Sequence, residues 1–178
     1  MEILLRKILF ICILSVLYTN TFSQKTSGLY DNSVEYEKQA VYLPIRTKNI
    51  KNLISSGYGY RNHPIIKKRL LHNGIDIRAH YEAVFSVALG LVKKVGYDNR
   101  SGNFIVIEHL NGFTTSYCHL SSIFVEKNQI VIAGYNIGIS GNTGNSTGPH
   151  LHFSLKVNGN SIDPLEFILS IEAKNKKS

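Results

Sequence analysis

Two pairs of residues carry side chains that could bind a metal ion or transfer a proton. His72 and Asp76 are four residues apart, and His150 and His152 are separated by a single residue. Because alternate residues of an extended chain point to the same side, each pair is expected to share one face of a strand. Imidazole and carboxylate groups gathered in this way suit metal binding or acid–base chemistry.

The segments around these pairs indicate how they are positioned. A long loop rich in Gly, Asn, Ser and Thr, residues 138–149, comes directly before His150. Such a loop lets the backbone approach a ligand closely. Gly74 and the alternation of Ile75 and Ile77 predict a loop running into a strand. Tyr117 and His119 form a third pair for which the same alternation predicts a shared face.

Two imidazoles and one carboxylate form the ligand set of a catalytic zinc ion, which keeps a fourth position for water. Zinc lowers the pKa of bound water to about 7 and polarises a carbonyl group. Histidines outside the ligand set can then act as base, acid or oxyanion stabiliser. The pattern alone leaves open whether His150 or His152 is the metal ligand.

The elements that must position these residues are predicted to be short strands. Apolar runs rich in β-branched and aromatic residues alternate with turn signals, which is typical of an all-β fold. The runs are 83–89, 91–97, 104–109, 113–118, 129–133 and 151–157. Asn111-Gly112 and Asn158-Gly159 predict two-residue hairpins. Asp163-Pro164 predicts a short helical turn through Leu169, and the charged tail is expected to fray.

The N-terminal residues have the pattern of an export signal. A basic start at Arg6 and Lys7, an apolar run of residues 8–18 and a small residue at Ser23 predict a signal peptide over residues 1–23. No second long apolar segment follows, so no transmembrane span is expected after signal removal. We predict an N-terminal arm or linker at 24–50, one domain at 51–170 and a charged tail at 171–178.

Composition limits the classes of function. The chain has 178 residues, 43% of them apolar, with 20 Lys and Arg against 12 Asp and Glu. This is a globular composition with a net charge of +8, which favours anionic partners. Nucleic-acid binding is not expected, because no strand pair interleaves aromatic and basic residues. Removal of the signal would take Cys12 and leave Cys118 as the single thiol, so no internal disulfide is expected.

Four segments in order resemble the signature of the M23 peptidases, the lysostaphin-like zinc endopeptidases of bacterial cell walls. They are Ser-Gly-Tyr-Gly-Tyr-Arg-Asn-His-Pro at 56–64, His-Asn-Gly-Ile-Asp at 72–76, Tyr-Cys-His-Leu at 117–120 and Ser-Thr-Gly-Pro-His-Leu-His-Phe at 146–153. The resemblance runs from about Ile54 to Phe167. It implies a partly open core of two antiparallel β-sheets, with a groove and few short helical turns.

The resemblance also implies a role for each site residue. His72, Asp76 and His152 match the zinc ligands, with one zinc ion per chain. His119 and His150 match the two catalytic histidines. The assignment of His152 rather than His150 to the metal rests on this resemblance.

Further positions match the groove or depart from the family. Tyr117 and Arg61 match groove-lining positions, and His63 is assigned either to substrate binding or to a structural role. Cys118 stands where a small residue is usual, and Ser154 replaces a common acidic residue. We interpret Cys118 as a buried structural thiol and expect Ser154 on the face of His150 and His152, where it would affect substrate preference.

The sequence therefore predicts an exported zinc endopeptidase that hydrolyses peptide cross-links of peptidoglycan. Its partners would be peptidoglycan peptides, its location the periplasm or cell envelope, and its state monomeric. One alternative is a catalytically inactive wall-binding or hydrolase-activating module of the same fold. Another is a swivelling carrier-type barrel, but the chain lacks a lysine at a hairpin tip with the neighbours that such carriers need.

Overall fold

The computed structural model describes residues 41–62 and 69–175, which all belong to one compact unit of the chain. The predicted signal peptide, most of the predicted arm and His63 lie outside the described residues. Among the residues described, no helix is both long and apolar enough to cross a membrane.

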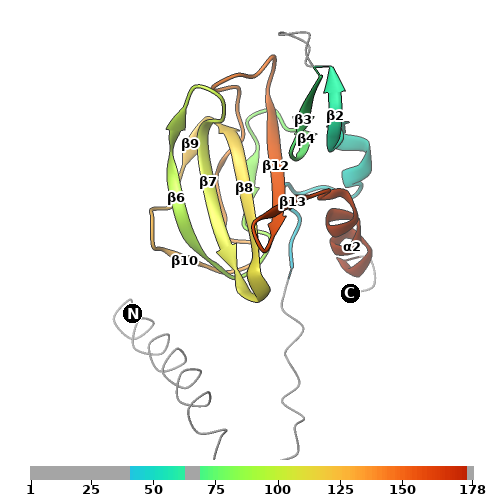
Figure 1. Cartoon of the computed structure of the whole chain (residues 1–178). Coiled ribbons are helices and arrows are strands. Elements are labelled where there is room, and N and C mark those ends of the chain that lie inside the picture. The colour runs from blue at the N-terminus through green and yellow to red at the C-terminus, as the bar shows by residue number, and fades with distance from the viewer. Residues whose placement is uncertain (1–40, 63–68, 176–178) are drawn as a thin grey trace, which may run out of the picture. The chain divides into compact units, whose positions relative to one another are not determined.

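The largest element is an antiparallel sheet with the strand order β1-β4-β12-β8-β7-β6-β10, to which β13 adds by pairing with β12 (Figure 1). Its strands are β1 Ile54–Ser56, β4 Ile75–Arg78, β6 Gly90–Asp98, β7 Gly102–His109, β8 Phe113–Leu120, β10 Ile130–Val131, β12 His150–Val157 and β13 Asn160–Ile162. Each run of alternating or β-branched residues predicted above contains or overlaps a strand.

A smaller sheet and a hairpin complete the β structure. The three-stranded sheet has the order β5-β11-β9, and β2 pairs with β3. These strands are β2 Gly59–Asn62, β3 Arg69–His72, β5 Ala83–Phe85, β9 Ser122–Ile123 and β11 Asn136–Ile139. Two 3-10 turns, η1 Ile50–Leu53 and η2 Leu110–Gly112, and the helix α2 Leu165–Asn175 are the helical elements of the described part. The predicted all-β antiparallel class is confirmed.

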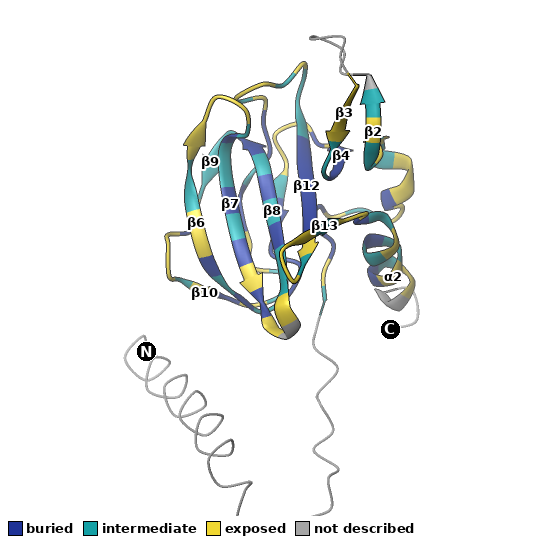
Figure 2. Ribbon diagram, in the orientation of Figure 1, coloured by how far each residue is buried: buried dark blue, intermediate teal, exposed yellow. Residues whose placement is uncertain are grey.

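The core brings together side chains from both larger sheets and from α2. Tyr117 and Phe153 of the large sheet, Ile137 of the small sheet and Ile168 of α2 belong to one buried cluster. Figure 2 shows the buried stretches along β8 and β12. The other face of these strands carries polar side chains, among them the buried His152 and Ser154.

Both ends of the predicted domain extend further than the sequence indicates. Leu43 and Ile45, which the sequence assigns to the arm, are buried in the core. The helix runs to Asn175 instead of ending near Leu169, because Ile171 adds a further turn to its buried side. Its Glu172 Oε1 accepts a hydrogen bond from Ile50 N at 2.9 Å, which ties the helix to η1.

The two predicted hairpin turns behave differently. Asn158 and Gly159 take φ values of 49° and 81°, as a type I′ turn requires. At the other site the chain forms the 3-10 turn η2 between β7 and β8 in place of a two-residue turn. Stacking of the His109 and Phe113 rings across this turn, with centroids 4.4 Å apart, accompanies the longer connection.

Candidate functional site

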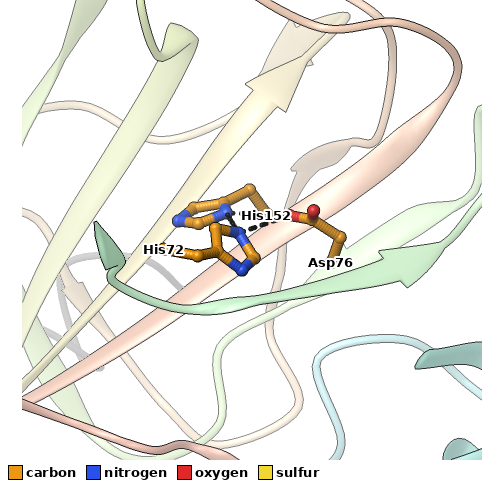
Figure 3. A group of neighbouring side chains, drawn as sticks. All are labelled: His72, Asp76 and His152. Atoms are coloured by element: carbon orange, nitrogen blue, oxygen red, sulfur yellow. Dashed lines mark hydrogen bonds and ion pairs between the residues drawn. The ribbon is translucent and has the colours of Figure 1, made fainter. Parts of the chain in front are cut away.

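Three side chains from three strands meet at the polar face of the large sheet (Figure 3). His72 ends β3, Asp76 lies in β4, and His152 lies directly opposite Asp76 in β12. His72 Nε2 lies 3.1 Å from Asp76 Oδ1 and 3.0 Å from His152 Nδ1, and the last two atoms are 2.9 Å apart. His72 and Asp76 therefore meet because a turn at Asn73-Gly74 joins two strands, and not because they alternate along one strand.

The three atoms His72 Nε2, Asp76 Oδ1 and His152 Nδ1 are spaced as the ligands of a single metal ion would be. His72 Nδ1 donates a hydrogen bond to Gly57 O at 2.6 Å, so Nε2 presents its lone pair to the other two atoms. A tetrahedral ion bound at about 2.0–2.1 Å would separate its ligands by roughly 3.3 Å. The observed separations come close to this value, and the three residues form a group that could hold a metal ion. Two imidazoles with one carboxylate suit zinc better than the oxygen-binding cations Mg²⁺ or Ca²⁺.

Asp76 has a different neighbour for each carboxylate oxygen. Oδ1 faces the imidazoles, whereas Oδ2 lies 3.5 Å from Arg61 Nη2. Burial raises the pKa of the Asp76 carboxyl, but hydrogen bonds and charge from His152 and His72 outweigh this effect and hold the pKa well below its usual range. Asp76 is thus a carboxylate at neutral pH, and Arg61, which was predicted to line the groove, lies beside it.

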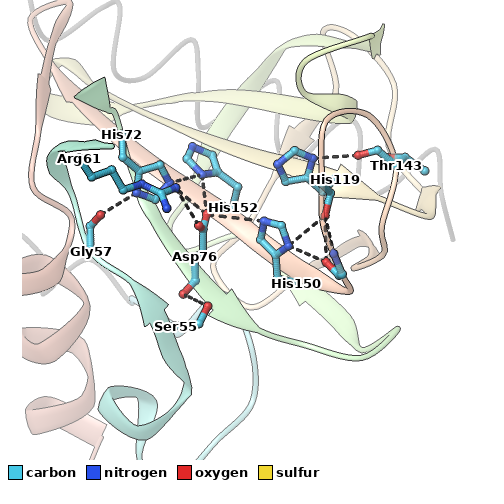
Figure 4. Close-up of polar contacts among 11 residues, drawn as sticks. Ser55, Gly57, Arg61, His72, Asp76, His119, Thr143, His150 and His152 are labelled. Atoms are coloured by element: carbon cyan, nitrogen blue, oxygen red, sulfur yellow. Dashed lines mark hydrogen bonds and ion pairs between the residues drawn. The ribbon is translucent and has the colours of Figure 1, made fainter. Parts of the chain in front are cut away.

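Two further histidines lie beside the metal-binding group (Figure 4). His150 Nε2 is 3.6 Å from Asp76 Oδ1, and its Nδ1 donates to Gly148 O at 2.8 Å. His119 Nδ1 donates to Thr143 O at 2.8 Å, and its ring centroid is 4.7 Å from that of His150. In both residues the hydrogen bond at Nδ1 leaves the Nε2 lone pair free to accept a proton.

The environment keeps His119 neutral. Burial lowers the pKa of His119 to about 4, and the charges of His150 and His152 add to this effect. An imidazole that is neutral at pH 7 is available as a proton acceptor. His150 shares its face of β12 with His152, as the alternation predicts.

Tyr117 does not share a face with His119, contrary to the alternation prediction. Tyr117 is fully buried, packs on the Phe153 ring and receives a hydrogen bond from Val87 N at its hydroxyl oxygen. His119 has φ +62°, and between the register pairs Tyr117–Ile105 and Leu120–Asn103 two residues of β8 face one of β7. This β-bulge turns His119 to the polar face, as bulges next to active sites do. The predicted substrate contact of Tyr117 does not fit its position in the core.

The two departures from the family pattern lie next to His152. Cys118 is directly opposite His152 in β8, and burial raises the pKa of its thiol to about 12. Cys118 is half-buried, and a thiol whose pKa is raised is a poor nucleophile at neutral pH. Ser154 is buried and follows His152 on the same face of β12, where the alternation predicts it.

The sequence did not indicate the main-chain carbonyl groups that accept hydrogen bonds from Nδ1 of His72, His119 and His150. They are the carbonyl groups of Gly57, Thr143 and Gly148. The glycines in the motifs were a signal for close backbone approach, but nothing in the spacing indicated which imidazole each carbonyl would meet.

Known proteins share this arrangement of sequence and fold. The model of peptidase family M23 matches residues 70–164. The chain is 42% identical over 117 residues to the DD-carboxypeptidase/endopeptidase Mpg of Neisseria meningitidis and 41% identical over 115 residues to the peptidoglycan DD-endopeptidase ShyA of Vibrio cholerae. These matches cover 65% and 64% of this chain, but only 27% of each relative. The chain thus spans about a quarter of their length.

Two solved structures have a similar fold. A zinc-containing peptidase from Vibrio cholerae has a TM-score of 0.63 at 35% identity, covering 70% of this chain and 39% of that one. The catalytic domain of lysostaphin from Staphylococcus simulans has a TM-score of 0.59 at 34% identity, covering 66% and 94%. The family match covers more than half of the chain and includes His72, Asp76 and His152. This chain therefore belongs to peptidase family M23.

Proposed function

We propose that the chain is an exported zinc endopeptidase that hydrolyses peptide cross-links of bacterial peptidoglycan. One observation carries the proposal: His72 Nε2, Asp76 Oδ1 and His152 Nδ1 lie close enough together to bind one metal ion. The imidazole rings of His119 and His150 lie beside this group. A non-catalytic protein of this fold would not need these five side chains to lie together.

His72, Asp76 and His152 would hold the zinc ion. When bound, zinc supplies a Lewis acid that polarises the scissile carbonyl and lowers the pKa of a bound water. Arg61 lies on the far side of the Asp76 carboxylate at 3.5 Å and leaves Oδ1 to face the imidazoles. Because 40% of the Arg61 side chain is exposed, it also has surface for a peptide lying along the site.

His119 and His150 would move the proton. The Nε2 of His150 lies close enough to Asp76 Oδ1 to reach a water or carbonyl oxygen held beside the three donors. A neutral imidazole accepts the proton of the attacking water at Nε2 and returns it to the leaving amine. Two imidazoles side by side allow one to take the proton while the other stabilises the developing oxyanion.

The proposed substrate follows from the relatives and the sequence. ShyA is named a peptidoglycan DD-endopeptidase and Mpg a DD-carboxypeptidase/endopeptidase. Together with the predicted export signal over residues 1–23, these names favour cross-links between stem peptides in the periplasm or envelope over glycine bridges. Ser154, where acidic residues are common in the family, is the position at which we expect substrate preference to differ.

The test combines metal content with digestion of murein. The purified chain should contain about one zinc ion, and incubation with cross-linked murein should remove dimeric muropeptides, whose product masses identify the bond cut. His152→Ala should lose zinc and activity together. His80→Ala is a matched control, because His80 is exposed and lies outside the group of five.

Two outcomes would contradict the proposal. Near-normal turnover by His152→Ala would exclude the assigned metal site. One zinc per chain without any loss of dimers would contradict the activity and favour a wall-binding or hydrolase-activating module.

A further inference from the structure

His119 is held in a backbone conformation that its own residue type does not favour. Its φ of +62° lies in the left-handed region, which is unfavourable for a non-glycine residue. Such a conformation persists only where the surroundings impose it. The contacts around the bulge identify what imposes it here.

The side chain of Thr143 joins the two strands at the bulge. Thr143 Oγ1 accepts a hydrogen bond from Asn103 N in β7 at 3.0 Å and donates one to Leu120 O in β8 at 2.8 Å. Asn103 Nδ2 donates a second hydrogen bond to Leu120 O at 3.0 Å. These bonds bridge the gap that the extra residue of β8 opens in the ladder.

The main chain of the same residue fixes the His119 ring. Thr143 O accepts the hydrogen bond from Nδ1, while the His119 amide donates to Ser101 O at 2.8 Å. Ser101 belongs to the turn between β6 and β7, which Asp98 closes by accepting hydrogen bonds from two amides of that turn. The ring of His119 is thus held by one loop and its backbone by another.

These two loops meet backbone to backbone. A Cβ added at Gly102 would lie 2.4 Å from the Thr143 carbonyl carbon, and one added at Gly144 would lie 2.2 Å from Gly102 N. The Thr143 hydroxyl is at the same contact, so both the side chain and the main chain of Thr143 pack directly on Gly102. The position of Thr143 is therefore fixed within narrow limits, and so is the acceptor that orients His119.

We infer that Thr143 is a positioning residue for His119: its hydroxyl locks the β7–β8 bulge and its carbonyl sets the Nδ1–H tautomer, so that Nε2 faces the metal-binding group. This inference rests on the proposed function for its kinetic consequence, but the tautomer and ring position follow from the contacts alone. Thr143 touches none of His72, Asp76 and His152 in the described contacts, so zinc binding should not depend on its hydroxyl.

The test compares two variants that differ by one oxygen atom. Thr143→Ala and Thr143→Ser both remove the methyl group, and only the second keeps Oγ. Thr143→Ala should lower kcat about 10–100-fold at unchanged zinc content and with little change in KM, because a misplaced proton-transfer group loses much of its effect. Thr143→Ser should restore kcat to within a few-fold of the parent. Thr114→Val, at the other end of β8, is the control for removal of a threonine hydroxyl.

Nitrogen-15 NMR of the imidazoles reports the tautomer of His119 directly, and a loss of stability alone would not change that tautomer. The parent should show His119 as the Nδ1–H tautomer with a slowly exchanging proton, and Thr143→Ala should lose that proton signal while its melting curve stays cooperative. If Thr143→Ala does not fold, Asn103→Ala removes the second side-chain bond to Leu120 O and should produce the same two changes.

The results that would overturn the inference are separate from those that would overturn the function. Equal kcat for Thr143→Ala and Thr143→Ser, or an unchanged His119 signal in Thr143→Ala, would exclude the positioning role. If the parent binds zinc but cuts no cross-link, the proposed function fails, and the NMR comparison still decides whether Thr143 positions His119.

Discussion

Gly74 offers a direct test of the metal-binding geometry, because it lies behind the His152 ring. A Cβ at residue 74 would come within 2.4 Å of Phe153 O and 2.8 Å of His152 Nε2. Ordinary van der Waals contact begins at about 3.4 Å, so the Phe153 carbonyl would be about 1 Å too close. Gly74→Ala must therefore displace the β3–β4 turn, the His152 ring or both.

The size of the effect follows from the tolerance of metal sites. Ligand distances in a metal site hold to within about 0.2 Å, and an added Cβ forces a shift several times larger. Changes of this kind around a ligand histidine typically weaken metal binding about 10–100-fold, which corresponds to ~1.4–2.8 kcal/mol. We expect a loss of zinc affinity in this range, together with a destabilisation of about 1–3 kcal/mol from overpacking.

Competition with a chromophoric chelator measures the zinc affinity of each variant. Thermal melts with and without zinc then distinguish a loss of zinc affinity from a loss of folding stability. Gly96→Ala is the matched control, since a Cβ at Gly96 in β6 would meet only the Phe104 ring, at 3.4 Å. If Gly74→Ala bound zinc as tightly as Gly96→Ala, the ring of His152 could not be part of the metal site in the geometry described.

Two further predictions concern other histidines. His150→Ala should keep about one zinc ion per chain but lose turnover by about 10²–10⁴-fold, the usual contribution of a proton-transfer group, whereas His152→Ala should lose both. Zinc content and murein digestion of the two variants decide this, and loss of zinc from His150→Ala alone would reverse their assignment. His109 makes a pH-dependent contribution to folding, because its burial lowers its pKa from the ordinary 6.5. The unfolded chain then binds this proton more readily, so stability is full above pH 6.5 and falls as the pH drops below it, by at most ~1.4 kcal/mol per pH unit. Urea unfolding of the metal-free chain at pH 7.5 and 5.5 should show a smaller loss for His109→Gln than for the parent, and equal losses would contradict the argument.

Much of the fold could be predicted from local pattern. Alternating and β-branched runs place the central strands, and Asn158-Gly159 gives its turn type because both residues tolerate positive φ. The ends of the domain could not be predicted in this way. Leu43 and Ile45 alternate as in a strand, but the run is short and Pro44 interrupts it. They are buried because main-chain hydrogen bonds from Tyr42 N to Val87 O and from Phe85 N to Pro44 O hold this segment beside residues 85–87.

The site shows the same division between local pattern and tertiary structure. The strand period correctly places His150 and His152 on one face, since β12 is regular over its whole length. It fails for Tyr117 and His119, because the bulge in β8 shifts the period by one residue. Tyr117 and Leu120 are both buried although residues three apart cannot share a face of a regular strand, and only the structure shows this.

The hydrogen bonds at the site explain why a few backbone positions matter as much as the side chains. His72, His119 and His150 each donate Nδ1–H to a main-chain carbonyl, at 2.6–2.8 Å. A carbonyl cannot be removed by substitution, so the orientation of each ring depends on where the backbone runs. It follows that substitutions which push the loops apart should impair the site more than removal of a neighbouring polar side chain. The close contact of Gly102 with Thr143 is the place where this difference should be largest, because a Cβ at Gly102 would meet the main-chain carbonyl of Thr143 as well as its hydroxyl.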